Sequence, residues 1–353
     1  MRYVFLTTGP WAGNASFERL YHFGAQLLAR GVEVGFVVDD LPGNRAMKLP
    51  AGAEVAFASP GGIKQVLSRR RAIRKLRPDF VHALNPAPKA VAALKGTRWK
   101  LIGDWDEWSE MRSDHRFPAW LERYIAKWFR RRAAVTVVCS RYMQSEFLSR
   151  YELAAHYIPY AADVQAPLAE SPSPFDKPTA VYMGSLHAQF DHDIMFEAAR
   201  LLAREGKRPE IAVIGGGPEV EKWREFVREK GLSNVTVKGR VSDSDRDAHL
   251  KHAHVLLFPI RPTPGNLARC PFKVFAYGQA RRPTITCRVG EVPQTFGEVA
   301  TYVEPTPEAF ARAIDEAMHR DQPDVDYQIE RQNWSARTDA LLEAIVPLQP
   351  KSA

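Results

Sequence analysis

The sequence is poor in cysteine, with three in 353 residues, at positions 139, 270 and 287. An odd number without close pairs argues against a disulfide framework and against a zinc knuckle. No apolar run approaches the roughly 20 residues that a bilayer-spanning helix needs. The opening residues, MRYVFLTTGP, read as a strand and carry no cleavable signal pattern, so a reducing, cytoplasmic setting is expected.

Positive charge exceeds negative charge by eight and is concentrated in SRRRAIRKLR (68–77) and RYIAKWFRRR (123–132). Such stretches suit nucleic acid, anionic lipid or a phosphorylated substrate, although most charge runs are solvated helix faces. In 123–132, aromatic residues stand at helical spacing beside the arginines, as in interfacial helices and also in core-facing ones. We expect peripheral contact with an anionic membrane at its cytoplasmic face, and no nucleic-acid partner.

Strand-like and helix-like segments alternate along almost the whole chain. The pattern runs from RYVFLTT to AVTVVCS in the first half and resumes from TAVYMGS to ATYVE. Between them lies QAPLAESPSPFDKP, a proline- and serine-rich segment typical of a linker. We therefore predict an α/β protein with two Rossmann-like, doubly wound parallel-sheet domains that face each other across a cleft.

The predicted boundaries are residues 1–165 for the first domain, 166–178 for the linker, 179–325 for the second domain and 326–353 for a final helix and tail. In open parallel sheets, ligands bind beyond the carboxyl ends of the strands. These strand ends are therefore where the site is expected.

Three glycines in AVIGGGPEVEKW stand between a predicted strand and a predicted helix, where a backbone can approach a phosphate closely. The dinucleotide-binding motif needs a further glycine at position 220, where Val220 stands, and Gly9 and Gly13 lack its spacing. Asp39 and Asp40 do end the second strand, as a ribose-binding acid would. A nicotinamide-dependent oxidoreductase is nevertheless disfavoured.

The segment PTPGNLARCPFK holds the densest candidate chemistry. Pro271 suits a helix start, which puts Lys273 in the first turn, with Asn266 and Arg269 just before it. A helix dipole, free N–H groups and two full charges would then converge on an anion. A single lysine is more often an ordinary exposed helix residue, but the neighbouring Gly/Pro loop favours the anion site.

The order and spacing of the segments resemble the GT-B glycosyltransferases, in particular the retaining family 4 (glycosyl transferases group 1). In the second half, the resemblance lies in YMGSLHAQFDHDIMFEAARLL, AVIGGGPEVEKWREFVREKGLSNVTVKGRV, AHVLLFPI and NLARCPFKVFAYGQARRPTI. In the first half, it lies in LLARGVEV, PDFVHAL and VTVVCSRYMQSEFLSRY. It implies an acceptor-side first domain, a nucleotide-sugar second domain and a last helix, NWSARTDALLEA, that crosses back to pack on the first domain.

The resemblance also implies an activity: a metal-independent, hexosyl-type glycosyltransferase that retains the anomeric configuration. Its co-substrate would be a UDP or GDP sugar, with no other cofactor. The acceptor would be a saccharide or lipid-linked saccharide, as in the synthesis of cell-surface polysaccharide. By position, the implied donor-binding residues are Gly13, Gly184, Ser185, Gly215, Gly217, Arg240, Val241, Asn266, Arg269 and Lys273.

The chain departs from the family pattern in its carboxylates and in one basic pair. The two donor-binding glutamates of the family fall at Ala268 and Ala276, and Ser185 and Phe190 replace the usual basic pair. Lys273 and Arg269 would then be the main charges on the diphosphate, where they stabilise the leaving group. A changed donor, an inactive sugar-binding relative and a sugar-nucleotide epimerase of the same fold all remain open.

The octet GDWDEWSE (103–110) gathers four acids around two tryptophans after a predicted strand. If protein charges hold the diphosphate, a metal at these acids would be redundant. We interpret the acids as acceptor-side groups, with Asp106 as the first candidate to orient or deprotonate the attacking hydroxyl and Asp104 and Glu107 next. For each of them, a helix N-cap role is about as plausible.

Two further residue types complete the predicted acceptor side. Trp105 or Trp108 would stack on a sugar face. His82, at the end of DFVHAL, is a second candidate near the strand ends, although a structural histidine fits equally well.

Overall fold

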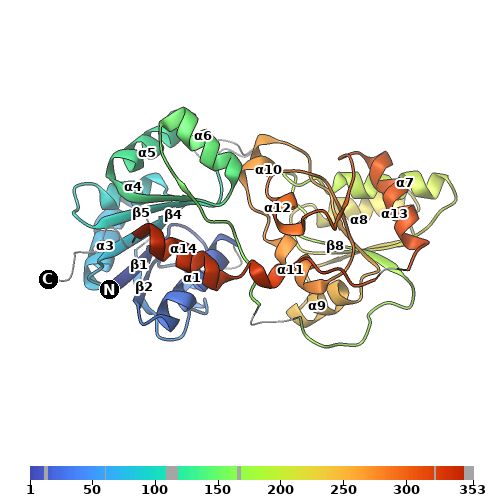
Figure 1. Ribbon diagram of the computed structural model, residues 1–353, viewed down its shortest axis with the longest axis horizontal. Coiled ribbons are helices and arrows are strands. Elements are labelled where there is room, and N and C mark those ends of the chain that lie inside the picture. Colours follow the sequence, from blue (N-terminus) through green and yellow to red (C-terminus); the bar gives the residue numbers. More distant parts are fainter. Residues whose placement is uncertain (12–14, 60, 109–117, 165–167, 322, 346–353) are drawn as a thin grey trace. The chain divides into compact units, whose positions relative to one another are not determined.

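The computed structural model describes residues 1–11, 15–59, 61–108, 118–164, 168–321 and 323–345. The chain forms two compact units, each built on its own parallel sheet (Figure 1). The first comprises Met1–Ala161, Leu267–Cys270 and Asn333–Ala353, and the second Ala162–Asn266 and Pro271–Gln332. The predicted pair of Rossmann-like α/β domains is confirmed.

The first unit has seven parallel strands in the order β3-β2-β1-β4-β5-β6-β7. Their bounds are β1 Arg2–Leu6, β2 Glu33–Asp39, β3 Glu54–Ala58, β4 Phe80–Leu84, β5 Lys100–Trp105, β6 Ala133–Val138 and β7 His156–Tyr157. The central strands β1 and β4 are buried along nearly their whole length. Helices on both faces of the sheet account for this burial.

The helices of the first unit form two layers. They are α1 Ala15–Ala29, α2 Pro42–Arg45, α3 Gly62–Lys75, α4 Pro88–Leu94, α5 Ala119–Arg132, α6 Arg141–Tyr151 and α14 Trp334–Ile345. Helices α3 to α6 pack side by side, whereas α14 packs on α1 (Figure 1). The last helix therefore returns to the first unit, as the resemblance implied. Its Asp339 and Ser335 accept hydrogen bonds from Arg30, at 2.8 and 2.7 Å.

The second unit has six parallel strands in the order β10-β9-β8-β11-β12-β13. Their bounds are β8 Thr179–Met183, β9 Glu210–Ile214, β10 Val235–Gly239, β11 Val255–Phe258, β12 Thr284–Thr286 and β13 Thr301–Tyr302. The helical elements are α7 Asp193–Arg204, α8 Val220–Glu229, α9 Asp243–Lys251, α10 Pro264–Ala268, α11 Lys273–Ala280, α12 Val292–Phe296, α13 Pro307–Met318 and the 3₁₀ helix Ile329–Arg331. Helix α13 packs on α7, and α9 and α12 pack on α11.

Local signals in the sequence explain several of these helix starts. Ser140, Ser242 and Thr306 each accept a hydrogen bond from a backbone N–H in the first turn of α6, α9 and α13. Pro307 follows directly as the first residue of α13. In both sheets, the carboxyl ends of parallel strands lie at one edge, where each βα loop places its side chains.

Candidate functional site

Glycines at the carboxyl ends of β8 and β9 bring two loops into direct backbone contact. A Cβ at Gly215 would overlap the carbonyl oxygen of Gly184, and a Cβ at Gly217 would overlap that of Leu186. Gly215 and Gly217 also have φ of +139° and +147°, which side chains rarely adopt. The Leu186 amide donates to the Gly216 carbonyl at 2.9 Å, so the two loops form one continuous backbone layer.

Lys273 lies directly beside this layer. It is the first residue of α11, and its Nζ lies so close to Gly184 that a Cβ there would overlap it. Nζ donates to the Tyr182 hydroxyl at 3.1 Å and lies 4.9 Å from the centroid of the Phe258 ring. An ammonium group is therefore held at a helix N-terminus, beside glycines that leave backbone accessible, which is an arrangement suited to a phosphate.

Other predicted donor-side residues lie at the same edge of the second sheet. Ser185 is exposed in the loop after β8, and Arg240 is exposed after β10, with its Cβ 3.5 Å from the position of a Cβ at Gly216. Val241 follows it and is half-buried. The roles assigned to these residues stay predictions.

Asn266 is buried, and its amide group is used inside the protein. Its Nδ2 donates to Asp191 at 2.7 Å and to the Arg261 carbonyl at 2.8 Å. Arg261 in turn forms ion pairs with Asp191 at 3.0 Å and Asp193 at 2.7 Å, and these hydrogen bonds raise the pKa of Arg261. This network was not predicted, although the FDHD sequence that carries two of its members is part of the family-like segment.

Two of the predicted donor-binding residues, Gly13 and Arg269, and the substituted position Ala268 do not lie with this group in the second unit. Gly13 lies outside the described residues. Arg269 belongs to Leu267–Cys270, which is part of the first unit, whereas Lys273 is part of the second. Ala268 is buried, and its carbonyl accepts a hydrogen bond from the Ser140 hydroxyl at 2.8 Å. Joint binding of a diphosphate by Arg269 and Lys273 therefore stays a prediction.

In the first unit, Asp104 is part of a buried ion pair. Arg19 of α1 donates to it through Nε at 2.8 Å and through a second nitrogen at 3.1 Å, and neither side chain is exposed. The imidazole of His82 lies 3.0 Å from the same carboxylate and 2.7 Å from the Tyr3 hydroxyl. Both side chains are enclosed, because β4 and β5 are inner strands of the sheet. This arrangement fits a structural role, and the predicted contact of Asp104 and His82 with an acceptor gains no support from it.

Asp106 lies two residues further, just past the end of β5. Its carboxylate accepts hydrogen bonds from the Asn85 amide and the Tyr160 hydroxyl. Burial, together with the nearby charge of Glu107, raises the pKa of Asp106 to about 6. A carboxyl group that titrates near neutrality at a strand end is a candidate for acid–base work.

The two tryptophans of the acidic octet are core residues. Trp105 packs edge-on against Phe129 and Phe147, with ring centroids at 5.3 and 5.2 Å. Trp108 is 3% exposed and packs against Phe147 and Tyr151. Stacking of either ring on a sugar is therefore not supported, whereas Glu107 is exposed beside them.

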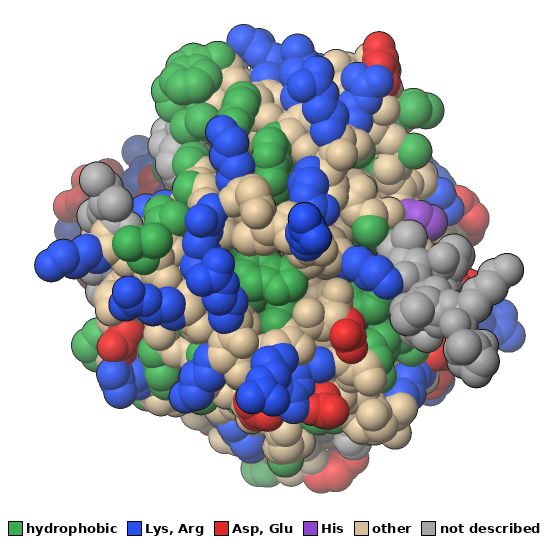
Figure 2. Space-filling view, turned by 90° about the vertical axis from the view of Figure 1, so that its left-hand side faces the viewer, with side chains coloured by type: hydrophobic (Ala, Val, Ile, Leu, Met, Phe, Trp, Pro, Cys, Tyr) green, Lys and Arg blue, Asp and Glu red, His purple; other side chains and the backbone are tan. Residues whose placement is uncertain are grey.

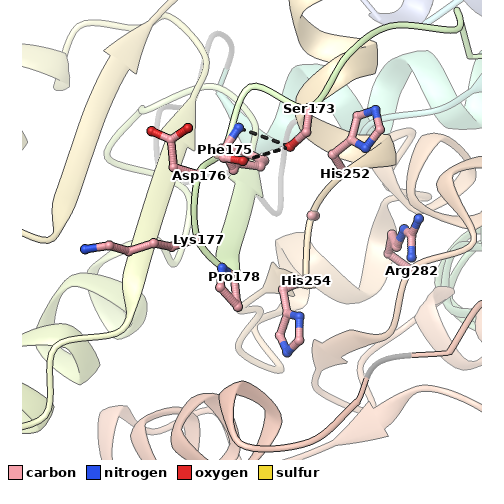
Figure 3. A pocket seen from close by; sticks show the side chains of 9 residues that line it. Ser173, Phe175, Asp176, Lys177, Pro178, His252, His254 and Arg282 are labelled. Atoms are coloured by element: carbon pink, nitrogen blue, oxygen red, sulfur yellow. Dashed lines mark hydrogen bonds between the residues drawn. The ribbon is translucent and has the colours of Figure 1, made fainter.

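The cavity in Figure 3, of about 290 Å³, lies at the opposite edge of the second sheet, before β8, β11 and β12. It is lined by Ser173, Phe175, Asp176, Lys177, Pro178, His252, Ala253, His254 and Arg282. His252 donates to the Ser171 carbonyl at 2.7 Å, His254 to the Ala317 carbonyl at 3.1 Å and Arg282 to the Lys251 carbonyl at 2.7 Å. Three of its basic groups thus hold neighbouring backbone, and Lys177 pairs with Glu210 at 3.6 Å. The carboxyl ends of the strands therefore remain the better candidate site.

Two properties concern metals and membranes. Among the described residues, no three His, Cys, Asp or Glu side chains lie together as a metal site would require. Within the same residues, none of the helices combines the length and the apolar character needed to cross a bilayer.

Comparisons with known proteins agree with this architecture. The family model of glycosyl transferases group 1 matches residues 177–320, and the model of glycosyltransferase family 4 matches residues 18–166. Together the two models cover most of the chain. No curated protein sequence matches it.

Several solved structures have the same fold at low sequence identity. A glycosyltransferase from Rickettsia africae is 13% identical, with a TM-score of 0.70 over 97% of this chain and 93% of that one. HepE from Anabaena, solved with UDP and glucose, is 16% identical, with a TM-score of 0.69 over 98% and 95%. The lipopolysaccharide outer core galactosyltransferase WaaB is 14% identical, with a TM-score of 0.69 over 99% and 100%.

Proposed function

Because the chain belongs to the glycosyl transferases group 1, with the GT-B fold, we propose that it transfers a sugar from a nucleoside-diphosphate sugar to a saccharide or lipid-linked acceptor, with retention of configuration. HepE binds UDP and glucose, and on that likeness UDP is the nucleotide proposed here. Transfer without a metal is part of the proposal.

The observation that carries this proposal is the position of Lys273 beside the glycine layer of the second unit. Its ammonium group lies at the first residue of α11 and over Gly184. There it would bind the diphosphate and stabilise the negative charge that develops as the sugar leaves. Arg269 is proposed as a second charge for this step.

The proposed reaction forms one bond and breaks another at the anomeric carbon. The acceptor hydroxyl attacks that carbon, and the bond to the phosphate oxygen breaks. The departing phosphate oxygen takes the proton of the hydroxyl. Asp106 is proposed to orient the acceptor by accepting a hydrogen bond from a second hydroxyl of the acceptor, next to the attacking one, so the carboxylate form of Asp106 is the active one.

Substitution of Lys273 tests the proposal. In Lys273→Ala, UDP binding measured by calorimetry should weaken, and turnover of UDP-sugar with acceptor should fall about 10²–10³-fold, as when one charge-stabilising donor is removed. Lys177→Ala is the matched control, since Lys177 is an exposed lysine before β8, at the other edge of the same sheet. Equal turnover by folded Lys273→Ala and wild type would refute the role.

The same assay separates the alternatives. Sugar conversion without an acceptor would identify an epimerase. UDP binding without any turnover would identify an inactive relative, which is the outcome that the missing carboxylates at Ala268 and Ala276 leave open.

Contact with an anionic membrane is proposed for the first unit. Figure 2 shows Lys and Arg side chains gathered on one face of this unit. Helix α5 exposes Trp120 and Tyr124 by 62% and 46%, next to the exposed Arg123 and Lys127, which is a composition suited to a lipid interface. Ile125 and Phe129, by contrast, pack in the core. Binding to vesicles of known charge is the measurement that tests this.

A further inference from the structure

We infer that Tyr160 and Asn85 are positioning residues for Asp106: together they fix the orientation of its carboxylate, so that its remaining lone pairs meet an acceptor hydroxyl. The inference rests on the proposed function, because it assigns Asp106 to the acceptor. All three residues belong to the first unit.

Asn85 connects the ends of β4 and β5. Its Nδ2 donates to one carboxylate oxygen of Asp106, and its Oδ1 accepts the backbone N–H of Asp106 at 3.0 Å and that of Glu107 at 3.3 Å. One side chain thus fixes both the carboxylate and the turn that carries it. Asn85 itself has φ +40°, a conformation that asparagine tolerates better than most residues.

Tyr160 fixes the second oxygen. It follows β7, and its hydroxyl donates to Oδ2 of Asp106. The ring is 3% exposed, packs edge-on against Trp334 at 5.9 Å and lies 5.5 Å from the guanidinium of Arg19. Since packing leaves the phenol little freedom, its hydroxyl is a preorganised donor.

Each carboxylate oxygen has two acceptor positions. The hydrogen bonds from Asn85 and Tyr160, together called the clamp, use one position on each oxygen. Asp106 is 3% exposed, and the inference requires that a hydroxyl reach the remaining positions through this uncovered part of the carboxylate. Without the clamp, the side chain would be free to rotate about its terminal torsion, which is broad and roughly two-fold.

The charges around Asp106 show why the clamp also affects ionisation. Burial raises its pKa first, and the charge of Glu107 raises it further, whereas the hydrogen bond from Tyr160, the charge of Arg19 and the hydrogen bond from Asn85 lower it. The Cys139 thiol of the next strand end donates to the Asp106 carbonyl at 3.3 Å. Loss of either clamp donor should therefore raise the pKa of Asp106.

The test follows the Asp106 carboxyl directly, by ¹³C NMR of the full chain labelled at aspartate carboxyl carbons. Wild type should show a resonance with a midpoint of about 6 that is absent from Asp106→Asn. In Tyr160→Phe, this midpoint should rise by about one pH unit, because a donor to the charged form is lost. Asn85→Gly, which tolerates the positive φ, should raise it as well.

Tyr3→Phe is the matched control. It removes a hydroxyl from another fully buried tyrosine of the same unit, whose partner is His82 and not Asp106. A merely structural effect would lower thermal stability in both tyrosine variants without moving the midpoint. An unchanged midpoint in Tyr160→Phe, or an equal shift in Tyr3→Phe, would overturn the inference.

Turnover with UDP-glucose as the probe donor separates this inference from the proposed function. If both hold, Tyr160→Phe lowers kcat, leaves the KM for UDP-glucose unchanged and moves the acid limb of the pH–rate profile to higher pH. Full turnover by Asp106→Asn would overturn the inference, because Asp106 would then have no catalytic role to be positioned for. If the wild type does not bind UDP-glucose although the Asp106 midpoint shifts in Tyr160→Phe, the proposed function is overturned instead.

Discussion

Breaking the buried pair between Arg19 and Asp104 should strongly destabilise the first unit. Both side chains are completely enclosed, and the guanidinium makes two hydrogen bonds to the carboxylate, at 2.8 and 3.1 Å. Asp104→Asn keeps the shape but leaves the charge of Arg19 buried without its counter-ion. Removal of one partner of such a pair costs about 3–5 kcal/mol of the free energy of unfolding.

Urea unfolding followed by tryptophan fluorescence measures this cost. Seven of the eight tryptophans, all except Trp223, belong to the first unit, so the signal reports mainly on it. The double variant Arg19→Met/Asp104→Leu should recover most of the loss, because it removes both charges. Asp40→Asn, which breaks the exposed pair with Arg45, is the matched control and should have a far smaller effect.

Similar urea midpoints for Asp104→Asn and Asp40→Asn would refute the reasoning.

The dependence of stability on acid pH provides a second measurement of the same pair. Burial alone would raise the pKa of Asp104, but Arg19 and then His82 more than offset it, so the pKa lies below its ordinary value. A group of this kind contributes stability above its unfolded pKa of about 3.9, and the contribution is lost as pH falls through the folded pKa. Wild type should therefore lose stability below about pH 4 more steeply than Asp104→Asn.

Two further predictions concern the second unit and the membrane. Gly215→Ala should lower the free energy of unfolding of the second unit by about 2–5 kcal/mol and abolish UDP binding, because its Cβ would overlap the Gly184 carbonyl. The control is Gly206→Ala, at φ +75° with open space around it, which should cost only about 1–2 kcal/mol. Equal losses of stability in thermal denaturation of the two variants would contradict this prediction. The double variant Arg123→Glu/Lys127→Glu should weaken binding to phosphatidylserine vesicles about tenfold or more. The control Lys177→Glu/Lys207→Glu, in the second unit, should leave this binding unchanged. If the wild type binds neutral vesicles as well as it binds phosphatidylserine vesicles, the proposed contact is excluded.

The alternation of strands and helices was enough to predict the architecture. Period and turn residues are local, and parallel strands with intervening helices have few packing solutions. The glycine layer was also predictable as a region of close approach, because GGG between a strand and a helix has a direct conformational reason. What the glycines at 215 and 217 approach, namely the carbonyls of Gly184 and Leu186, depends on the neighbouring strand and was not readable from the segment itself.

The burial of individual side chains was harder to predict. Arg19 and Asp104 are 85 residues apart in sequence, so no local pattern links them. A local hint was that Arg19 stands four residues before Phe23 and so shares a helix face with an apolar residue. Trp105 looked available for a sugar because it follows the strand, but it fills the space above Gly103, where a Cβ would lie 2.6 Å from its ring. Side-chain volume in a three-dimensional gap decided the outcome.

The octet that begins at Gly103 illustrates how environment separates two identical groups. Asp104 and Asp106 are both buried carboxyls two residues apart, yet the pKa of Asp104 lies below its ordinary value and that of Asp106 rises to about 6. Asp104 has a guanidinium as counter-ion, whereas Asp106 has only neutral donors in contact and a like charge next to it. A carboxylate neutralised by Arg19 stabilises the fold and has little left for chemistry. Asp106 has no such counter-ion, and this difference between the two carboxyls is the reason why Asp106, and not Asp104, is the one proposed to meet the acceptor.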